Sequence, residues 1–378
     1  MANDGRPSSE ELRRTCFDTV LLVRNLRQML GYGRMPVAFL VYRPQFPEAG
    51  VLIIGLPRYL IVKWLLSFLL FFVVASVSAQ LTYETLYVDY DSAWTYKNLK
   101  IIPIRKKGGG GEPGAGLGNI IPLNQALNQG LVTVTERGTT SFENVHWLRF
   151  NTHTDKSIYI SGGEIMTGGR QDRMVIRDTI LRPSEKDQYV PVMCVEEDRW
   201  SEKEKKFGYG AFANGHLRKV LDSTPNQVLI WKEIDRQLAS GGFKTKTDAY
   251  LSRDLGKKNK TYETGENDYF KWFYNKFQHT DSNIVGFVAI SGDKVIGSDI
   301  FATRGIFYGQ LDPLLHSYID DVILFGAPVT MTDPPIRRYM DKLLKDEKSQ
   351  EEFCRRNGKI FKEGTQVVHV NTFLKEGM

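Results

Sequence analysis

Side chains able to bind or convert a ligand are concentrated in two short segments of the sequence, residues 163–173 and 194–200. The arginines there present planar forks that suit carboxylate or phosphate groups, and an amide and several carboxylates accompany them. Neighbouring glycines would let backbone amides approach a bound molecule closely. The candidate ligand-binding residues are Glu164, Arg170, Gln171, Arg173, Glu196 and Arg199.

Two interpretations of this polar grouping stand side by side. If the segments are neighbouring strands, their side chains converge at one end of a sheet. Arg170 and Arg173 would then bind an anionic group, and Glu164 with Glu196 would be a candidate acid and base. Equally, the same residues would form a structural network that orders tight turns. The two interpretations differ in whether the side chains point into an open cleft or are buried against one another.

Other catalytic constellations are absent from the sequence. The six histidines never occur as H-x-x-x-H or H-E-x-x-H, no C-x-x-C is present, and no motif links Cys194 to a histidine. The glycine-rich run 106–116 lacks the G-K-[ST] ending of a phosphate-binding loop and predicts a surface loop. We therefore expect no metal site and no cofactor.

The elements that must position these residues change in type along the chain. Residues 144–200 contain short apolar strands separated by turn signals, a pattern typical of a compact antiparallel sandwich or barrel-like sheet. Farther on the apolar spacing becomes helical, with start signals at 224–225 and a Gly-Gly stop at 241–242. The predicted fold class is α+β: a β-rich antiparallel sandwich-like half at 96–200 and a mixed helix and β-hairpin half at 201–378, joined in one composite domain.

Further elements of the second half follow from the same patterns. Residues 257–268 are polar and predict a loop. The aromatic residues of 269–277 lie at helical spacing, which favours core packing over a stacking platform for bases or sugars. A hairpin at 284–301, helices at 311–324 and 335–356, and a final strand at 366–372 complete this half.

The front of the chain carries the pattern of a secretory signal. A short basic region at 58–63 precedes the apolar run 64–77, and small side chains lead up to Gln80. The uncharged run of about 14 residues is shorter than the roughly 20 that span a bilayer. Because a signal begins near its translation start, we expect an over-extended gene start at 1–57, a cleaved signal peptide at 58–79 and a linker at 80–95.

A secreted chain would reach the periplasm or the extracellular space. It would contact a membrane only through the signal segment, before cleavage. Cys194 and Cys354 would remain after cleavage and could form one disulfide in an oxidising compartment. Two small buried thiols are the more common arrangement.

The charge of the chain is unevenly distributed. The net charge is +6, but residues 1–79 hold nine basic and five acidic side chains, which leaves 41 basic against 39 acidic side chains in the remainder. A balance of +2 lacks the basic stripe that nucleic-acid binding relies on. We therefore expect no nucleic-acid partner.

Four segments taken in order resemble the ARG and Rhodanese-Phosphatase-superfamily-associated Protein domain family. They are Gly-Glu-x-x-x-Gly-Gly-x-Gln-x-Arg at 163–173, Val-Pro-Val-x-Cys-Val-Glu-x-x-Arg-Trp at 190–200, the hairpin 285–301, and Val-Val-His-Val-Asn-Thr-Phe at 367–373. The likeness covers most of residues 96–375. It implies an order of elements and no mechanism, while the family's name points to an association with ADP-ribosylglycohydrolases and rhodanese-phosphatases.

Two functions are compatible with these observations. The first is a secreted, non-catalytic binding or interaction module that recognises a small anionic ligand or a protein partner through its Arg/Glu/Gln site. The alternative is a hydrolase of a phosphate- or sugar-containing substrate, for example an ADP-ribose-like one, that uses a carboxylate as acid or base.

Overall fold

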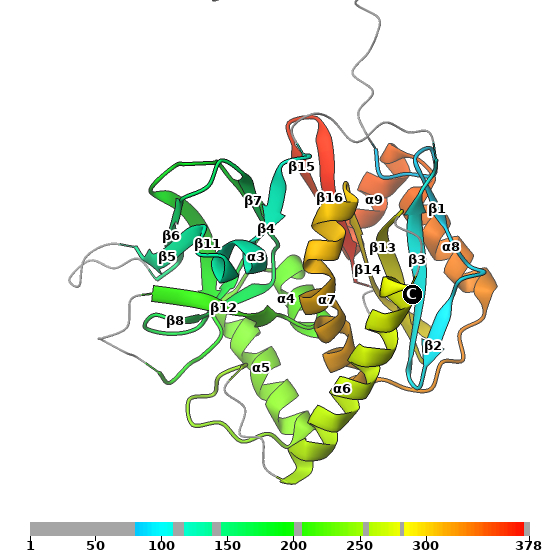
Figure 1. Cartoon of the computed structure of the whole chain (residues 1–378). Helices are drawn as coiled ribbons and strands as arrows, with labels where there is room; N and C mark the ends of the chain where they lie inside the picture. Colours follow the sequence, from blue (N-terminus) through cyan, green and yellow to red (C-terminus); the bar gives the residue numbers. More distant parts are fainter. Residues whose placement is uncertain are drawn as a thin grey trace, which may run out of the picture. The chain divides into compact units, whose positions relative to one another are not determined.

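The computed structural model describes residues 80–108, 117–137, 145–199, 206–251, 257–279 and 283–373, without the side chains of 257–263. The described residues belong to one compact unit (Figure 1). The expected signal segment 58–79 and the stretch 1–57 lie outside the described residues. Among the helices in the described ranges, none has the length and apolar character needed to cross a membrane.

A seven-stranded antiparallel sheet forms one part of the unit. Its order is β1-β3-β13-β14-β16-β15, and β2 pairs with β3 beside this path. The strands are β1 (Leu86–Val88), β2 (Trp94–Tyr96), β3 (Leu99–Lys106), β13 (Ile284–Ser291), β14 (Lys294–Phe301), β15 (Gly358–Glu363) and β16 (Gln366–Thr372). The predicted hairpin at 284–301 is the pair β13–β14 at its centre.

Helices cover both faces of this sheet. Every residue of β13 is buried, and its side chains alternate between two cores. Phe287 and Ala289 belong to the core that packs against α6 (Lys257–Gln278) and α7 (Arg304–Phe325). Val288 and Ile290 belong to the core under α8 (Asp333–Leu344) and α9 (Glu347–Asn357). A central strand buried on both faces is apolar throughout, as its sequence shows.

The β-rich half closes into a barrel of strand order β11-β6-β5-β12-β8-β9. Its strands are β5 (Val132–Glu136), β6 (Trp147–Thr152), β8 (Glu164–Gly168), β9 (Arg173–Val175), β11 (Gln188–Cys194) and β12 (Lys206–Phe212). Beside it, β4 (Ile120–Pro122), β7 (Ser157–Ile160) and β10 (Thr179–Leu181) form a small sheet in which β4 and β7 are parallel. The α+β class is confirmed, and β12, which lies beyond residue 200, completes the barrel.

The remaining helices are α3 (Leu123–Asn128), α4 (Gly215–Ser223) and α5 (Gln227–Gly241). Helix α5 begins and ends close to the signals that the sequence carries. The side chain of Asn226 accepts hydrogen bonds from the first backbone N–H groups of α5, and Gly242 ends that helix in a left-handed conformation with φ of 61°. The predicted helix starting near 224–225 is therefore present.

The helix expected at 335–356 is two helices, α8 and α9, and the helix expected at 311–324 begins earlier, at Arg304. Two further segments differ from their predicted structure. The polar residues 257–268 form the first half of α6, because this helix buries only one stripe, which includes Tyr269, Phe273 and Phe277. Residues 80–95, expected to be a linker, contain β1 and the start of β2, and both strands pair with β3. Tertiary packing stabilises both segments, and local sequence signals do not report it.

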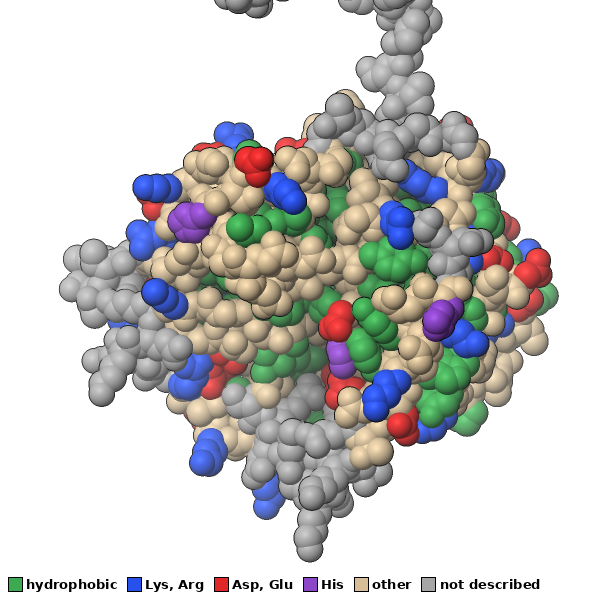
Figure 2. All heavy atoms as spheres, viewed as in Figure 1, with side chains coloured by type: hydrophobic (Ala, Val, Ile, Leu, Met, Phe, Trp, Pro, Cys, Tyr) green, Lys and Arg blue, Asp and Glu red, His purple; other side chains and the backbone are tan. Residues whose placement is uncertain are grey.

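The aromatic cluster of α6 packs into the core, as its spacing predicts. Tyr269, Phe273 and Phe277 are buried. Trp272 is half-buried against the same core and stacks on Tyr96 of β2, with ring centroids 5.3 Å apart. Figure 2 shows hydrophobic side chains gathered over α6 and β2 on this face.

Candidate functional site

The residues singled out from the sequence are mostly bonded to one another. Arg199 donates from Nε to Glu196 Oε2 at 2.7 Å and from Nη2 to Asp172 Oδ1 at 2.9 Å. It also donates to the backbone carbonyls of residues 168 and 169. These bonds tie the turn after β8 to the segment after β11.

Gln171 and Arg173 extend this network inward. Gln171 Nε2 donates to the carbonyl of Glu196 at 2.9 Å, and its Oε1 accepts from Arg173 at 3.0 Å. The fully buried Arg173 also donates to Cys194 Sγ, and its Nη2 lies 3.9 Å from Glu136 Oε1. This arrangement has the form of the turn-ordering network, and the ligand-binding role of these residues stays a prediction.

Glu164 and Arg170 occupy separate positions. Glu164 is fully buried and accepts from the Ser161 N–H at 2.8 Å and from Gln310 Nε2 at 3.1 Å. Within the part of the chain that the structure describes, it shares no hydrogen-bond partner with Glu196. Burial raises the pKa of Glu164 to about 8. Arg170 is buried, and its backbone N–H donates to Glu136 Oε1 at 2.9 Å.

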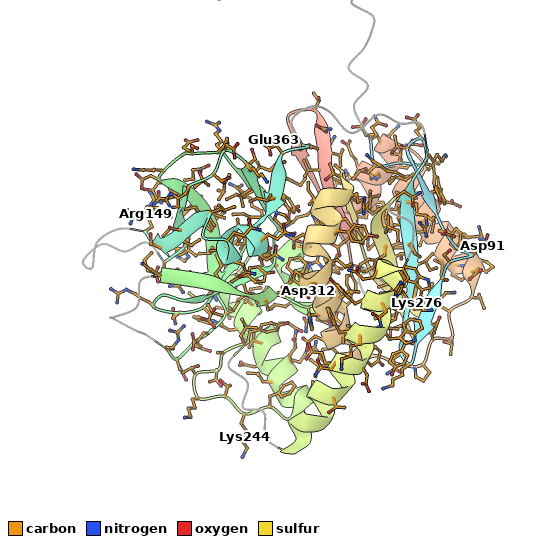
Figure 3. The ribbon with its side chains drawn as sticks, in the orientation of Figure 1. Asp91, Arg149, Lys244, Lys276, Asp312 and Glu363 are labelled. Carbon is orange, nitrogen blue, oxygen red and sulfur yellow. The ribbon has the colours of Figure 1, made fainter. Side chains whose placement is uncertain are left out.

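A different set of residues surrounds an open cavity of about 490 Å³. It lies between the edge strands β10 and β15, and we call it the seam cavity. Residues 176–180, Asp222 at the end of α4, four residues of β15 and Asn371 of β16 line it together with Gly162. One of the β15 residues is Glu363, which Figure 3 labels at the end of that strand. None of the six candidates from the sequence lines this cavity.

A chain of alternating charges leads from the seam cavity into the interior. His369 Nδ1 lies 2.6 Å from Asp178 Oδ2, and its Nε2 lies 3.0 Å from Asp299 Oδ1. Asp299 in turn accepts two hydrogen bonds from Arg218 and one from the Tyr318 hydroxyl at 2.6 Å. His369, Asp299 and Arg218 are almost fully buried, whereas the Asp178 side chain is 14% exposed. Asp178 is therefore the member of this series of charges that contacts solvent.

The imidazole of His369 is held in its charged form. Burial alone would lower its pKa, but the carboxylates of Asp178 and Asp299 outweigh burial and raise the pKa to about 9. Both ring nitrogens face a carboxylate, so both act as donors in the imidazolium. His369 consequently has no nitrogen left to act as a base towards a bound molecule.

Asp178 is kept ionised by its donors. Burial alone would raise its pKa, but the charge and hydrogen bond of His369, the Gly162 N–H at 2.7 Å and the Tyr159 hydroxyl at 2.9 Å hold the pKa below its usual value. A carboxylate with about four acceptor positions retains one for a ligand after three bonds. Asp178 therefore presents a fixed acceptor to the seam cavity.

Arg218 fixes the inner end of the chain. Its guanidinium lies between the rings of Phe212 and Phe373, at 4.4 and 4.6 Å from their centroids. Gly163, with φ of 99°, passes so close that a Cβ there would lie 2.9 Å from Arg218 Cγ. The glycine of the Gly-Glu motif thus makes room for the buried arginine.

A second carboxyl group, that of Asp222, also lines the seam cavity. Asp222 pairs with Lys359 Nζ at 3.1 Å and accepts from Asn371 Nδ2 at 3.3 Å. Burial raises the pKa of Asp222 against the opposing charge of Lys359. Among the described residues, no group of three or more His, Cys, Asp or Glu side chains is arranged to hold a metal ion.

Sequence reasoning missed this constellation, although part of its signal was visible. His369 and Asn371 belong to the motif at 367–373, which the sequence offered only as part of a resemblance. Asp178, Asp222 and Lys359 carry no local motif, because they come from three separate elements. The two cysteines, Cys194 and Cys354, are buried and unbonded to each other.

A sequence model of the ARG and Rhodanese-Phosphatase-superfamily-associated Protein domain matches residues 87–372. This range contains both the Gln171–Arg199 network and the seam cavity. No curated protein and no solved structure matches the chain.

Proposed function

The chain belongs to the ARG and Rhodanese-Phosphatase-superfamily-associated Protein domain family, and we propose that it is a non-catalytic binding module whose ligand occupies the seam cavity. The observation that carries this proposal is Asp178, an ionised carboxylate fixed by three donors at an accessible cavity. A buried cation, His369, held behind it preorganises the acceptor before any ligand arrives.

The lining favours a neutral ligand rich in hydroxyl groups, such as a sugar ring. Asp178 offers an acceptor and Lys359 offers donors, while Ile360 and Phe361 supply apolar surface. A hydroxyl both donates and accepts, and the carbon face of a sugar can lie against an aromatic ring. Because Asp178, Asp222 and Glu363 outnumber the two cations that line the cavity, a phosphate group would meet net repulsion.

Saturation-transfer NMR with glucose, galactose, mannose and ribose tests this proposal. Signals from at least one sugar should vanish in Asp178→Asn and weaken in Lys359→Gln. The matched control is Asp187→Asn, which neutralises a carboxylate with 61% side-chain exposure outside the cavity. Absence of any sugar signal in the parent protein, or equal loss in the control, would contradict a sugar site.

A second candidate, glycoside hydrolysis, is favoured by one observation. The pKa of Asp222 is raised and that of Asp178 is lowered. Two carboxyl groups with pKa values shifted in opposite directions can divide the roles of acid and base. Asp222 would give its proton to the leaving oxygen as the glycosidic bond breaks. Asp178 would take a proton from the water whose oxygen bonds to the anomeric carbon. Release of nitrophenol from aryl glycosides, lost in Asp222→Asn, would favour this candidate over a pure binding module.

Secretion is part of the proposal and is supported by the signal pattern in the sequence. The chain would act in the periplasm or outside the cell after cleavage before Gln80. Amino-terminal sequencing of the exported protein should begin at Gln80, and a mature chain that still contains Cys16 would contradict it.

A further inference from the structure

A second hollow, away from the seam cavity, lies on the outer faces of α4 and α5. Its volume is about 630 Å³. We call it the α4–α5 groove. It is lined by His216, Lys219, Val220 and Ser223 of α4, Leu229, Lys232, Glu233 and Arg236 of α5, and the connecting Thr224.

The lining residues recur at the same spacing on both helices. The set on each helix falls at i, i+3, i+4 and i+7, which places it on a single helix face. The opposite faces are buried and include Leu217 and Leu221 of α4 and Ile230 and Ile234 of α5. Two adjacent helices therefore turn a continuous, mixed polar and apolar face away from the core.

Apolar side chains are unusually exposed at one end of this groove. Val228 is 55% exposed and Leu229 is 42% exposed, and they are two of the four most exposed large hydrophobic residues among those described. Both lie on the first turn of α5, and Leu229 lines the groove. The groove therefore has an exposed apolar side chain beside the helix connection.

The charge of the groove is positive. Its one carboxylate, Glu233, accepts two hydrogen bonds from Arg236 at 2.6 and 2.8 Å and one from Gln237. Lys219 and Lys232 also line the groove, so its lining holds three Lys and Arg side chains and one carboxylate.

The wall of the groove is held in place by aromatic contacts. The ring of Phe325 at the end of α7 lies between His216, at 4.5 Å, and the guanidinium of Arg236, at 4.4 Å. His216 Nδ1 also lies 2.8 Å from Asp321 Oδ1. His216 and Arg236 are thereby partly ordered before a partner binds, which lowers the entropic cost of association.

From this combination we propose that the α4–α5 groove binds an acidic amphipathic helix of a partner protein. Leucine-type side chains of that helix pack on Leu229 and Val220, and its carboxylates meet Lys219, Lys232 and Arg236. This is the helix-in-groove mode of recognition, in which apolar anchors give affinity and flanking charges give orientation. The inference is independent of the ligand in the seam cavity.

Fluorescence anisotropy tests this with a labelled probe peptide of 15 residues, the length of α5, with leucines on one face and glutamates on the other. The parent protein should bind it saturably. Lys232→Glu and Leu229→Asp should each weaken binding by about tenfold or more. Circular dichroism would check that both variants stay folded, as expected for exposed positions.

Two controls separate a specific groove from general charge attraction. Lys186→Glu makes the same charge change at an exposed position between β10 and β11, and it should leave binding within about twofold of the parent. A scrambled peptide of identical composition should bind at least tenfold more weakly. No saturable binding up to about 1 mM protein, equal binding of the scrambled peptide, or an equal effect of Lys186→Glu would overturn the proposal.

Discussion

His369 and Asp178 are 191 residues apart in the sequence, yet His369 Nδ1 lies 2.6 Å from Asp178 Oδ2. This contact joins β16 of the seven-stranded sheet to the segment that leads into β10. It also sets the charge state of both partners, because each stabilises the ionised form of the other. One ion pair therefore connects the assembly of the two sheets with the acceptor that faces the seam cavity.

His369→Gln should lower the free energy of unfolding by about 3–5 kcal/mol, because it leaves two buried carboxylates without their shared cation. Urea unfolding followed by tryptophan fluorescence at pH 6 would measure this. The matched control is His153→Gln at an exposed position, where a change within about 0.5 kcal/mol is expected. Equal effects of the two substitutions would contradict the role given to His369.

Stability should fall as the pH rises from 6.5 towards 9. The pKa of His369 is raised from 6.5 to about 9 in the folded state, so its contribution is complete below 6.5 and is lost as the pH passes through 9. One proton gives a slope of at most about 1.4 kcal/mol per pH unit. Urea unfolding across this range should show a shallower slope in His369→Gln than in the parent.

Glu164→Gln should be at least as stable as the parent above pH 8. Burial raises the pKa of Glu164 from 4.5 to about 8, so the folded state favours the proton and loses stability as the pH rises from 4.5 through 8. A neutral amide avoids this loss, and the buried Gln310 Oε1, which has no hydrogen-bond partner among the described residues, can accept from it. Thermal melts of the variant and the parent at pH 5 and pH 8.5 would show whether the variant gains stability relative to the parent at the higher pH. A variant less stable than the parent at both pH values would refute the prediction.

Gly163→Ala should destabilise the fold by about 1–3 kcal/mol. The positive φ of 99° is unfavourable for alanine, and the added Cβ would press against Arg218 at 2.9 Å. Gly118→Ala is the control, because its Cβ would meet nothing within 4 Å. A differential scanning calorimetry comparison in which both variants melt alike would rule out this packing argument.

Arg199→Ala should lower stability by about 2 kcal/mol and leave sugar binding unchanged. The substitution removes the Arg199 guanidinium from Glu196, which is 1% exposed and has no other cationic partner among the described residues. Arg182→Ala, at 80% side-chain exposure, is a control expected to be neutral. If Arg199→Ala instead abolished ligand binding without loss of stability, the site would lie at the 168–199 network and not at the seam cavity.

Much of the fold was predictable because its signals are local. The spacing of Val228, Trp231, Ile234 and Leu238 and the stop at Gly241-Gly242 identify α5, and the apolar run at 284–290 identifies a buried strand. The loop expected at 257–268 is a helix because Tyr269, Phe273 and Phe277 anchor it against the core. Propensity alone does not report such anchoring.

The candidate site was also predictable only in part. The polar density at 163–173 and 194–200 is visible in the sequence, but its two possible roles, ligand binding and turn ordering, differ only in where the side chains point. In the structure Arg199 and Gln171 bond to neighbouring carboxylates and carbonyls. The seam cavity escaped notice because Asp178, Asp222 and Lys359 come from separate elements and share no spacing rule.

The sequence by itself determined the family, the α+β class and the ends of α5, since periodicity, capping and turn chemistry act over a few residues. Only the tertiary structure decided that β12 closes the barrel and that Asp178, His369, Asp299 and Arg218 line up from the cavity to the core. These strands and charged side chains are far apart in the sequence and meet only in the folded chain. The pKa values of the side chains depend on burial and on neighbouring charges, which no local sequence pattern encodes.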